Sequence, residues 1–200
     1  MQKQSMWSIK FSTAALVLIP AAIGINYIGK LFAGALKLPL WLDAIGTILA
    51  SMLAGPIIGA ISGAVNNVIY GLTMDPISIV YGITSAAIGL VAGIMAYKGW
   101  IASWKKAIVT GLVVGLTAVV VSTPLNIGFW GGQTGNPWGD ALFATVMGST
   151  GSMWLASFCN EIVVDLPDKL LVVLVSYAIF RGLPNGVKQL YSKNEVEELD

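Results

Sequence analysis

Histidine is absent from this sequence of 200 residues, and cysteine occurs once, as Cys159. Without histidine the chain has no imidazole general base and no Cys/His set of the kind that holds zinc. One cysteine excludes an intramolecular disulfide, so Cys159 is best explained as a small apolar residue. We therefore expect no metal centre of that kind and no bound cofactor.

Charge is also scarce, because only 10% of the residues are Asp, Glu, Lys or Arg, against roughly a quarter in soluble domains. Hydrophobic residues make up 56% of the chain, and the mean hydropathy is +0.80. The net charge is +1 and the basic residues are scattered, which excludes a nucleic-acid surface. This composition predicts an integral membrane protein with a single domain over residues 1–200.

Apolar runs fill most of the chain, and a helix needs about 20 apolar residues to cross a hydrocarbon core of about 30 Å. The charge-free stretch from Ala44 to Met74 is too long for one span and short for two. Gly55-Pro56 near its middle predicts a turn between two short spans. We therefore predict an all-α bundle of six transmembrane helices, at about residues 11–36, 38–54, 56–73, 78–97, 107–127 and 158–180.

The distribution of basic residues favours six spans over five. With six, one side of the membrane receives Lys3, Lys10, Lys98, Lys105, Lys106, Arg181, Lys188 and Lys193, and only Lys30, Lys37 and Lys169 lie on or near the other. Five spans would remove this bias. The prediction places both termini in the cytoplasm, together with the polar tail 188–200.

The segment from Gly128 to Ser157 is the least regular part of the sequence and lies between spans five and six. Asn136-Pro137 is typical of a helix start, but the apolar stretch that follows to Met147 is too short to cross a membrane. Two interpretations stay open, namely a lid or re-entrant element over an outer cavity and an interfacial helix with aromatic residues at headgroup level.

The last span contains the most informative polar residues. Lys169 precedes Arg181 by twelve residues, or roughly 18 Å of helix, so it lies within the outer half of the membrane. Glu161, Asp165 and Asp168 share a helix face at spacings of four and three. Intramembrane charges usually face protein or a water-filled cavity. Either these carboxylates face a ligand, or Asp165 only neutralises Lys169, which would leave the other two unexplained.

Further amide, hydroxyl and aromatic side chains are expected at the same outer depth, where they could bond or stack on a planar ligand. The predicted substrate-binding residues are Trp41, Asp43, Asn66, Asn67, Tyr70, Tyr81, Asn126, Trp130, Trp138, Asn160, Glu161, Asp165 and Lys169. Small residues repeat every four positions at Gly55, Gly59 and Gly63, which indicates close helix packing and a place where a membrane partner could dock.

Three motifs together resemble a known family. They are Leu42-Asp43-Ala44-Ile45-Gly46-Thr47, the Gly55 to Ala60 segment that continues to Asn66-Asn67, and Pro167-Asp168-Lys169. In this order they resemble the substrate-binding S components of energy-coupling factor vitamin transporters, over about residues 20–180. The chain looks closest to the branch that holds riboflavin, hydroxymethylpyrimidine and pyridoxine binders.

The resemblance implies a prokaryotic cell-membrane protein that binds a vitamin or its precursor from outside and is not an enzyme. It further implies docking on a module of one transmembrane coupling subunit and two ATPase subunits. Members of the family often dock through two alanines four residues apart on the first helix, and Pro20 and Gly24 stand at the matching places here.

Three classes of function remain from the sequence. The leading hypothesis is capture of a planar heterocycle such as hydroxymethylpyrimidine or pyridoxine, with riboflavin or a nucleoside-like compound as the alternative ligand. The second is a membrane enzyme in which Glu161, Asp165 and Asp168 do acid–base work or hold a hard metal ion. The third is a sensor or scaffold within a larger complex.

Overall fold

The computed structural model describes residues 13–192, and these contain helices, turns and loops but no strand. The elements are α1 (Thr13–Ala35), α2 (Ile45–Ala54), α3 (Pro56–Thr73), the 3-10 helix η1 (Pro76–Ile79), α4 (Gly82–Tyr97), α5 (Trp104–Trp130), α6 (Pro137–Thr150), α7 (Met153–Gly182) and α8 (Asn185–Ser192). The prediction of an all-helical fold is confirmed for this part of the chain. The N-terminal residues and the end of the polar tail, 193–200, lie outside it.

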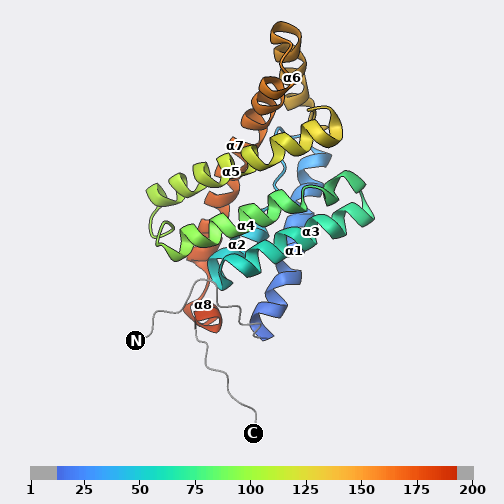
Figure 1. The fold of residues 1–200 in the computed structure, drawn as a ribbon. Coiled ribbons are helices and arrows are strands. Elements are labelled where there is room, and N and C mark those ends of the chain that lie inside the picture. The colour runs from blue at the N-terminus through green and yellow to red at the C-terminus, as the bar shows by residue number, and fades with distance from the viewer. Residues whose placement is uncertain (1–12, 193–200) are drawn as a thin grey trace.

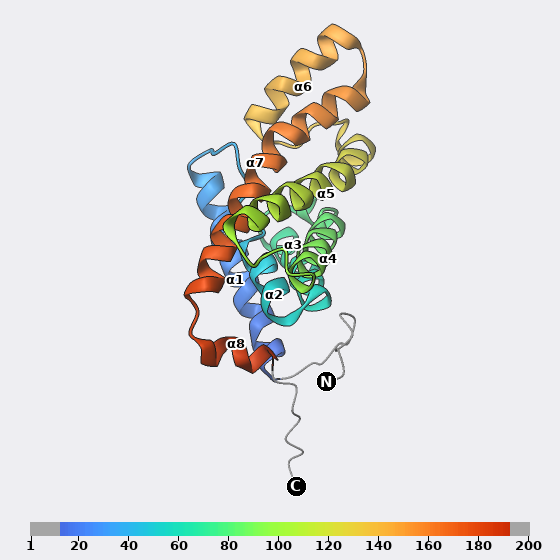
Figure 2. The ribbon, with the colours of Figure 1, turned by 90° about the vertical axis from the view of Figure 1, so that its left-hand side faces the viewer.

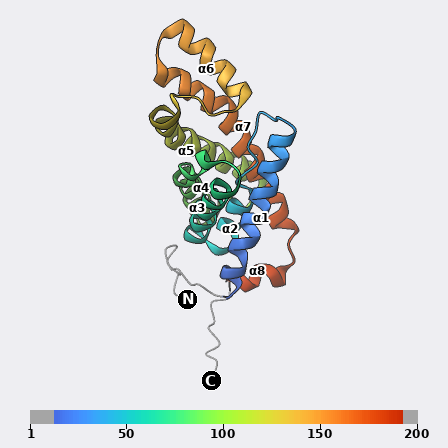
Figure 3. The same cartoon turned by 90° about the vertical axis from the view of Figure 1, so that its right-hand side faces the viewer.

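Helices α3, α4 and α5 pack in sequence beside one another and cross α1 and α7 (Figure 1). The pairing of α5 with α7 is the most extensive in the bundle. Helix α6 and the first turns of α7 pack together and project beyond the other helices (Figure 2). The start of α1 lies at the end of the molecule opposite α6, where α8 contacts α1 and α2 (Figure 3).

The turn expected at Gly55-Pro56 separates α2 from α3. Gly55 has a φ of 91°, which glycine adopts without steric cost, and Pro56 begins α3 where its missing N–H leaves no helical bond unmade. The expected span 38–54, however, is helical only from Ile45. The preceding loop, residues 36–44, contains a proline and two residues with positive φ, Lys37 and Leu42. Helix α2 is thus only about 15 Å long.

Other helix bounds also differ from the predicted spans. Helix α4 begins at Gly82 instead of residue 78, because Pro76 starts the separate turn η1. Helix α5 is longer at both ends than 107–127, and α7 begins at Met153, well before residue 158. The 131–136 loop and α6 occupy the segment that the sequence left open.

Glycines allow the closest helix contacts. A Cβ on Gly59 would collide with the side chain of Ser51 on α2, and a Cβ on Gly63 would lie 2.6 Å from the carbonyl oxygen of Ser85 on α4. Facing them on α4, Gly89 packs against the backbone of α3. Gly59 and Gly63 therefore hold the bundle together from inside. The predicted close helix packing at these two glycines is confirmed. Helices of this chain cover them, and their predicted docking role stays a prediction.

Beside its apolar core, the bundle buries several amide side chains and exposes many large apolar ones. Asn26, Asn66, Asn67, Asn126 and Asn160 are each at most 1% exposed. Large apolar side chains are exposed along the outer faces of the helices instead, among them Leu16, Val17, Ile28, Phe32, Leu72, Ile83, Val120 and Val163. By length and composition, α1 and α5 are able to cross a membrane, which is weak evidence for membrane association.

Candidate functional site

A pocket lined mostly by polar side chains lies among α1, α3, α4, α5 and α7. It is lined by Lys30, Trp41, Asp43, Asn67, Asp75, Ile77, Ser78, Tyr81, Thr84, Ser85, Ile88, Ser122, Thr134, Glu161, Asp165 and Lys169. Seven of the predicted binding residues are among them, namely Trp41, Asp43, Asn67, Tyr81, Glu161, Asp165 and Lys169. The structure therefore gathers these seven, which come from four separate parts of the sequence, around one space.

Lys169 is the centre of a buried charge cluster. Its ammonium lies 2.6 Å from an Asp168 oxygen, 3.0 Å from Asp43 and 3.7 Å from Asp165. The Lys169 side chain is 3% exposed, so the partners must neutralise a charge that has almost no contact with water. The two closest come from the neighbouring residue and from the 36–44 loop. Asp165, the partner suggested by helical spacing, is the most distant of the three.

Asp168 fixes the 36–44 loop in addition to pairing with Lys169. Its Oδ1 accepts hydrogen bonds from the backbone N–H groups of Trp41, at 3.1 Å, and Leu42, at 2.9 Å. The loop is not helical here, so these N–H groups need a partner outside the regular backbone pattern. Asp168 is fully buried and does not line the pocket. Its contacts are therefore structural.

Asp43 lies in the same loop, outside the helices. Its carboxyl oxygen lies 3.0 Å from the Lys169 ammonium, and this ion pair joins the loop to α7.

Glu161 is held by a chain of hydrogen bonds across the bundle. The side-chain amide of Asn126, on α5, donates to Glu161 Oε1, and the hydroxyl of Tyr81 donates to Asn126 Oδ1. Glu161 is 3% exposed and Asn126 is fully buried. Asn126 therefore positions both Glu161 and Tyr81 from behind the pocket wall and is not itself a lining residue.

Short polar side chains on α3, α4 and α5 form another part of the pocket lining. Asn67 on α3 donates to Ser85 Oγ at 2.5 Å, and the hydroxyls of Thr84 and Ser122 lie 3.1 Å apart. These bonds cross from α3 to α4 and from α4 to α5. They satisfy buried polar groups that would otherwise be costly and fix the shape of the pocket.

Lys30 was not predicted as a binding residue, although it lines the pocket. Its ammonium donates to Ser78 Oγ at 2.8 Å and lies 4.2 Å from the centre of the Tyr70 ring. The ring of Tyr70 in turn packs on Tyr27 with 5.1 Å between the centroids. The signal for Lys30 in the sequence was that it interrupts an apolar run, as Lys169 does.

Several other predicted residues lie away from the pocket. Tyr70 contacts Lys30 from outside the lining, and Asn66, Trp130, Trp138 and Asn160 are not lining residues either. Asn160 donates to Asp140 Oδ1 at 3.0 Å, and Trp138 Nε1 donates to the Lys37 carbonyl at 3.2 Å. These two bonds attach α6 to α7 and to the 36–44 loop, next to Thr134 of the pocket.

Comparison of the chain with protein-family models, with curated proteins and with solved structures finds no match.

Proposed function

We propose that this chain spans a membrane six times and captures a small planar heterocycle from outside the cell for an ATP-driven importer. In this proposal it acts as the substrate-binding S component of an energy-coupling factor transporter, the family that its motifs resemble. The observation that carries the proposal is a charged pocket enclosed by helices whose outer faces are apolar.

The membrane part of the proposal rests on the distribution of polarity. Lipid cannot hydrogen-bond to buried amides, so a membrane bundle turns its asparagines inward and its large apolar side chains outward, as this chain does. Helix α2 alone is about half as long as the hydrocarbon core is thick. The 36–44 loop supplies the missing length, and Asp168 satisfies two of its backbone N–H groups at that depth.

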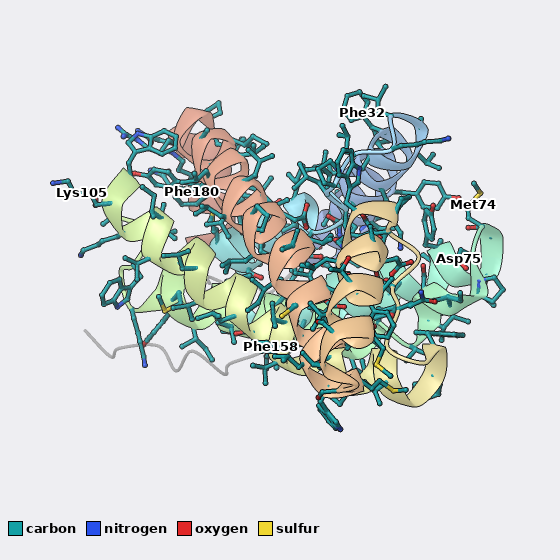
Figure 4. The ribbon with its side chains drawn as sticks, turned by 90° about the horizontal axis from the view of Figure 1, so that it is seen from above. Phe32, Met74, Asp75, Lys105, Phe158 and Phe180 are labelled. Atoms are coloured by element: carbon teal, nitrogen blue, oxygen red, sulfur yellow. The ribbon has the colours of Figure 1, made fainter. Side chains whose placement is uncertain are left out.

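The topology part rests on which connections lie at the same end of the bundle. Seen from above, Lys105 at the start of α5 and Asp75 after the end of α3 lie at opposite ends (Figure 4). The Lys105 end carries the basic 98–106 segment and, in the six-span arrangement, faces the cytoplasm. The Asp75 end carries η1, part of the pocket lining, and faces outward.

Single cysteines test this topology in intact cells. In a background with Cys159→Ala, we expect Ser103→Cys, just before α5, to resist a membrane-impermeant thiol reagent until the cells are opened. Ser149→Cys on α6 should react in intact cells. Both side chains are exposed at helix ends or surfaces, so a lack of reaction reports the side of the membrane. Reaction of both cysteines in intact cells would exclude the six-span arrangement.

The ligand part rests on the side chains around the pocket. Glu161 and Asp165 offer acceptors to N–H or O–H groups of a ligand, and the rings of Trp41 and Tyr81 offer surfaces for a flat molecule. A hydroxymethylpyrimidine-like or pyridoxine-like compound fits this set, and riboflavin or a nucleoside-like compound is the alternative. The family resemblance supports a vitamin or precursor over other planar molecules.

Docking on the energising module is assigned to α1. Pro20 and Gly24 lie four residues apart on its exposed face, and a Cβ on Gly24 would meet no atom within 4 Å. Small residues on an open helix face permit close approach of another membrane helix. This face would therefore contact the transmembrane coupling subunit, which carries the two ATPase subunits.

Native mass spectrometry of protein purified in mild detergent tests the function. We expect the wild-type chain to retain one small molecule, and purification under gentler conditions to recover the coupling subunit and ATPase subunits with it. Protein that retains no small molecule, both as purified and after incubation with the small-molecule filtrate of a cell lysate, would contradict the proposal. Retention without any partner would leave capture intact and contradict the assignment to an importer.

The enzyme hypothesis is less favoured because its third carboxylate is occupied. Asp168 holds the 36–44 loop and Lys169, and it does not line the pocket. A catalytic group must reach the substrate directly or through one water. Only Glu161 and Asp165 remain for acid–base work, and we propose binding roles for both.

A further inference from the structure

Lys30 is the one ammonium group of the pocket that lacks an ion pair in the described structure. The salt bridges found among residues 13–192 all involve Lys169, so no carboxylate oxygen there lies within 4.0 Å of the Lys30 nitrogen. An ammonium has three donors, and Ser78 accepts from one of them. The face of Tyr70 stabilises the charge without accepting a conventional hydrogen bond.

The side chain is nevertheless held in a defined place. Lys30 comes from α1, Ser78 from η1 and Tyr70 from α3, so three separate elements fix the ammonium at the pocket wall. Tyr27 supports the Tyr70 ring from behind, and its hydroxyl lies 3.0 Å from that of Thr73. A lysine that only served to reach water would gain nothing from such positioning.

Lys30 changes what the charges of the pocket lining imply about the class of ligand. The lining contains four carboxylates, from Asp43, Asp75, Glu161 and Asp165, and two ammonium groups. By that balance alone, the preferred ligand would be a simple cation. Lys169 already has Asp43 and Asp168 as close partners. Lys30 has donors left, and a cation placed against it would be repelled.

We infer that Lys30 binds an acceptor oxygen of the captured molecule, whose donor groups face Glu161 and Asp165. The inference rests on the proposed function and narrows its ligand class. The molecule is a heterocycle that carries both an N–H, amino or hydroxyl donor and a carbonyl, carboxylate or phenolate-type oxygen. Simple organic cations and amines without such an oxygen are excluded.

The first measurement compares variants on one compound. The wild type is incubated with the small-molecule filtrate of a cell lysate, and the retained compound is identified by native mass spectrometry. We expect Lys30→Met to bind that compound about tenfold to a hundredfold more weakly, and Lys30→Arg, which keeps the charge, to recover much of the loss. Lys37→Met is the matched control, because Lys37 is exposed and does not line the pocket.

The second measurement separates binding from folding. An analogue of the retained compound that lacks the acceptor oxygen should bind the wild type at least about tenfold more weakly than the parent compound does. It should bind wild type and Lys30→Met equally. The comparison of the analogue with the parent compound uses the wild type alone. It therefore tests the role of Lys30 even if Lys30→Met does not fold.

The outcomes distinguish this inference from the function on which it rests. Three results would overturn the role of Lys30 and leave capture intact. The retained compound could lack an acceptor oxygen, or wild type and Lys30→Met could bind the retained compound equally. The third such result is an analogue that binds the wild type as well as the parent compound does. If the wild type retains no compound at all, the proposed function falls, and the role of Lys30 falls with it.

Discussion

Replacing Asp168 with asparagine is expected to lower the free energy of unfolding by about 3–5 kcal/mol, the usual cost of breaking a buried ion pair by removal of one partner. The change removes the closest carboxylate of Lys169 and weakens the acceptor of two backbone N–H groups, those of Trp41 and Leu42. Asparagine keeps the size of the side chain, so the loss reports charge and hydrogen bonding instead of a cavity.

The measurement is denaturant or thermal unfolding in one detergent, with Asp75→Asn as the matched control. Asp75 caps η1 by accepting from Ile77 N–H and is partly exposed. Asparagine caps helices about as well as aspartate, so the control should change stability little. If Asp168→Asn were no less stable than Asp75→Asn, Asp168 would not be the anchor of the 36–44 loop.

Glu161→Gln and Asp165→Asn are each expected to weaken binding of the retained compound by about 1.5–3 kcal/mol, or roughly tenfold to more than a hundredfold. Each change replaces a carboxyl acceptor on the pocket wall with an amide acceptor of the same size. The amide oxygen of glutamine can still accept from Asn126, which keeps the chain to Tyr81. Lys169 keeps its two closest partners when Asp165 changes, so its ammonium stays paired.

Affinity and unfolding temperature are therefore measured together on each variant. Ser62→Ala is the control for loss of a buried polar group. Among residues 13–192, the Ser62 hydroxyl bonds only to the Ile58 carbonyl of its own helix, and it lies outside the pocket. Unchanged affinity with a lower unfolding temperature in both acidic variants would mean that Glu161 and Asp165 are structural. The ligand would then have to contact the Asn67 and Lys30 side of the pocket.

The sequence by itself determined the features that depend on neighbouring residues along the chain. The all-helical fold follows from long apolar runs, and the break between α2 and α3 follows from a glycine and a proline in succession. The shared face of Glu161 and Asp165 follows from helical spacing alone. Both line the pocket, because α7 continues as a helix through Pro167.

The tertiary structure decided which residues meet and which face of each helix is covered. One partner of Lys169, Asp43, is 126 positions away in the sequence. Ser78 in η1, which accepts from Lys30, is 48 positions away from that lysine. Gly59 and Gly63 face α2 and α4, although their spacing fitted an outer docking stripe equally well. Helical periodicity defines which residues share a face of a helix. Only the packing of neighbouring helices determines whether that face points inward, because the same small or charged residues suit a contact within the chain and a contact with another molecule.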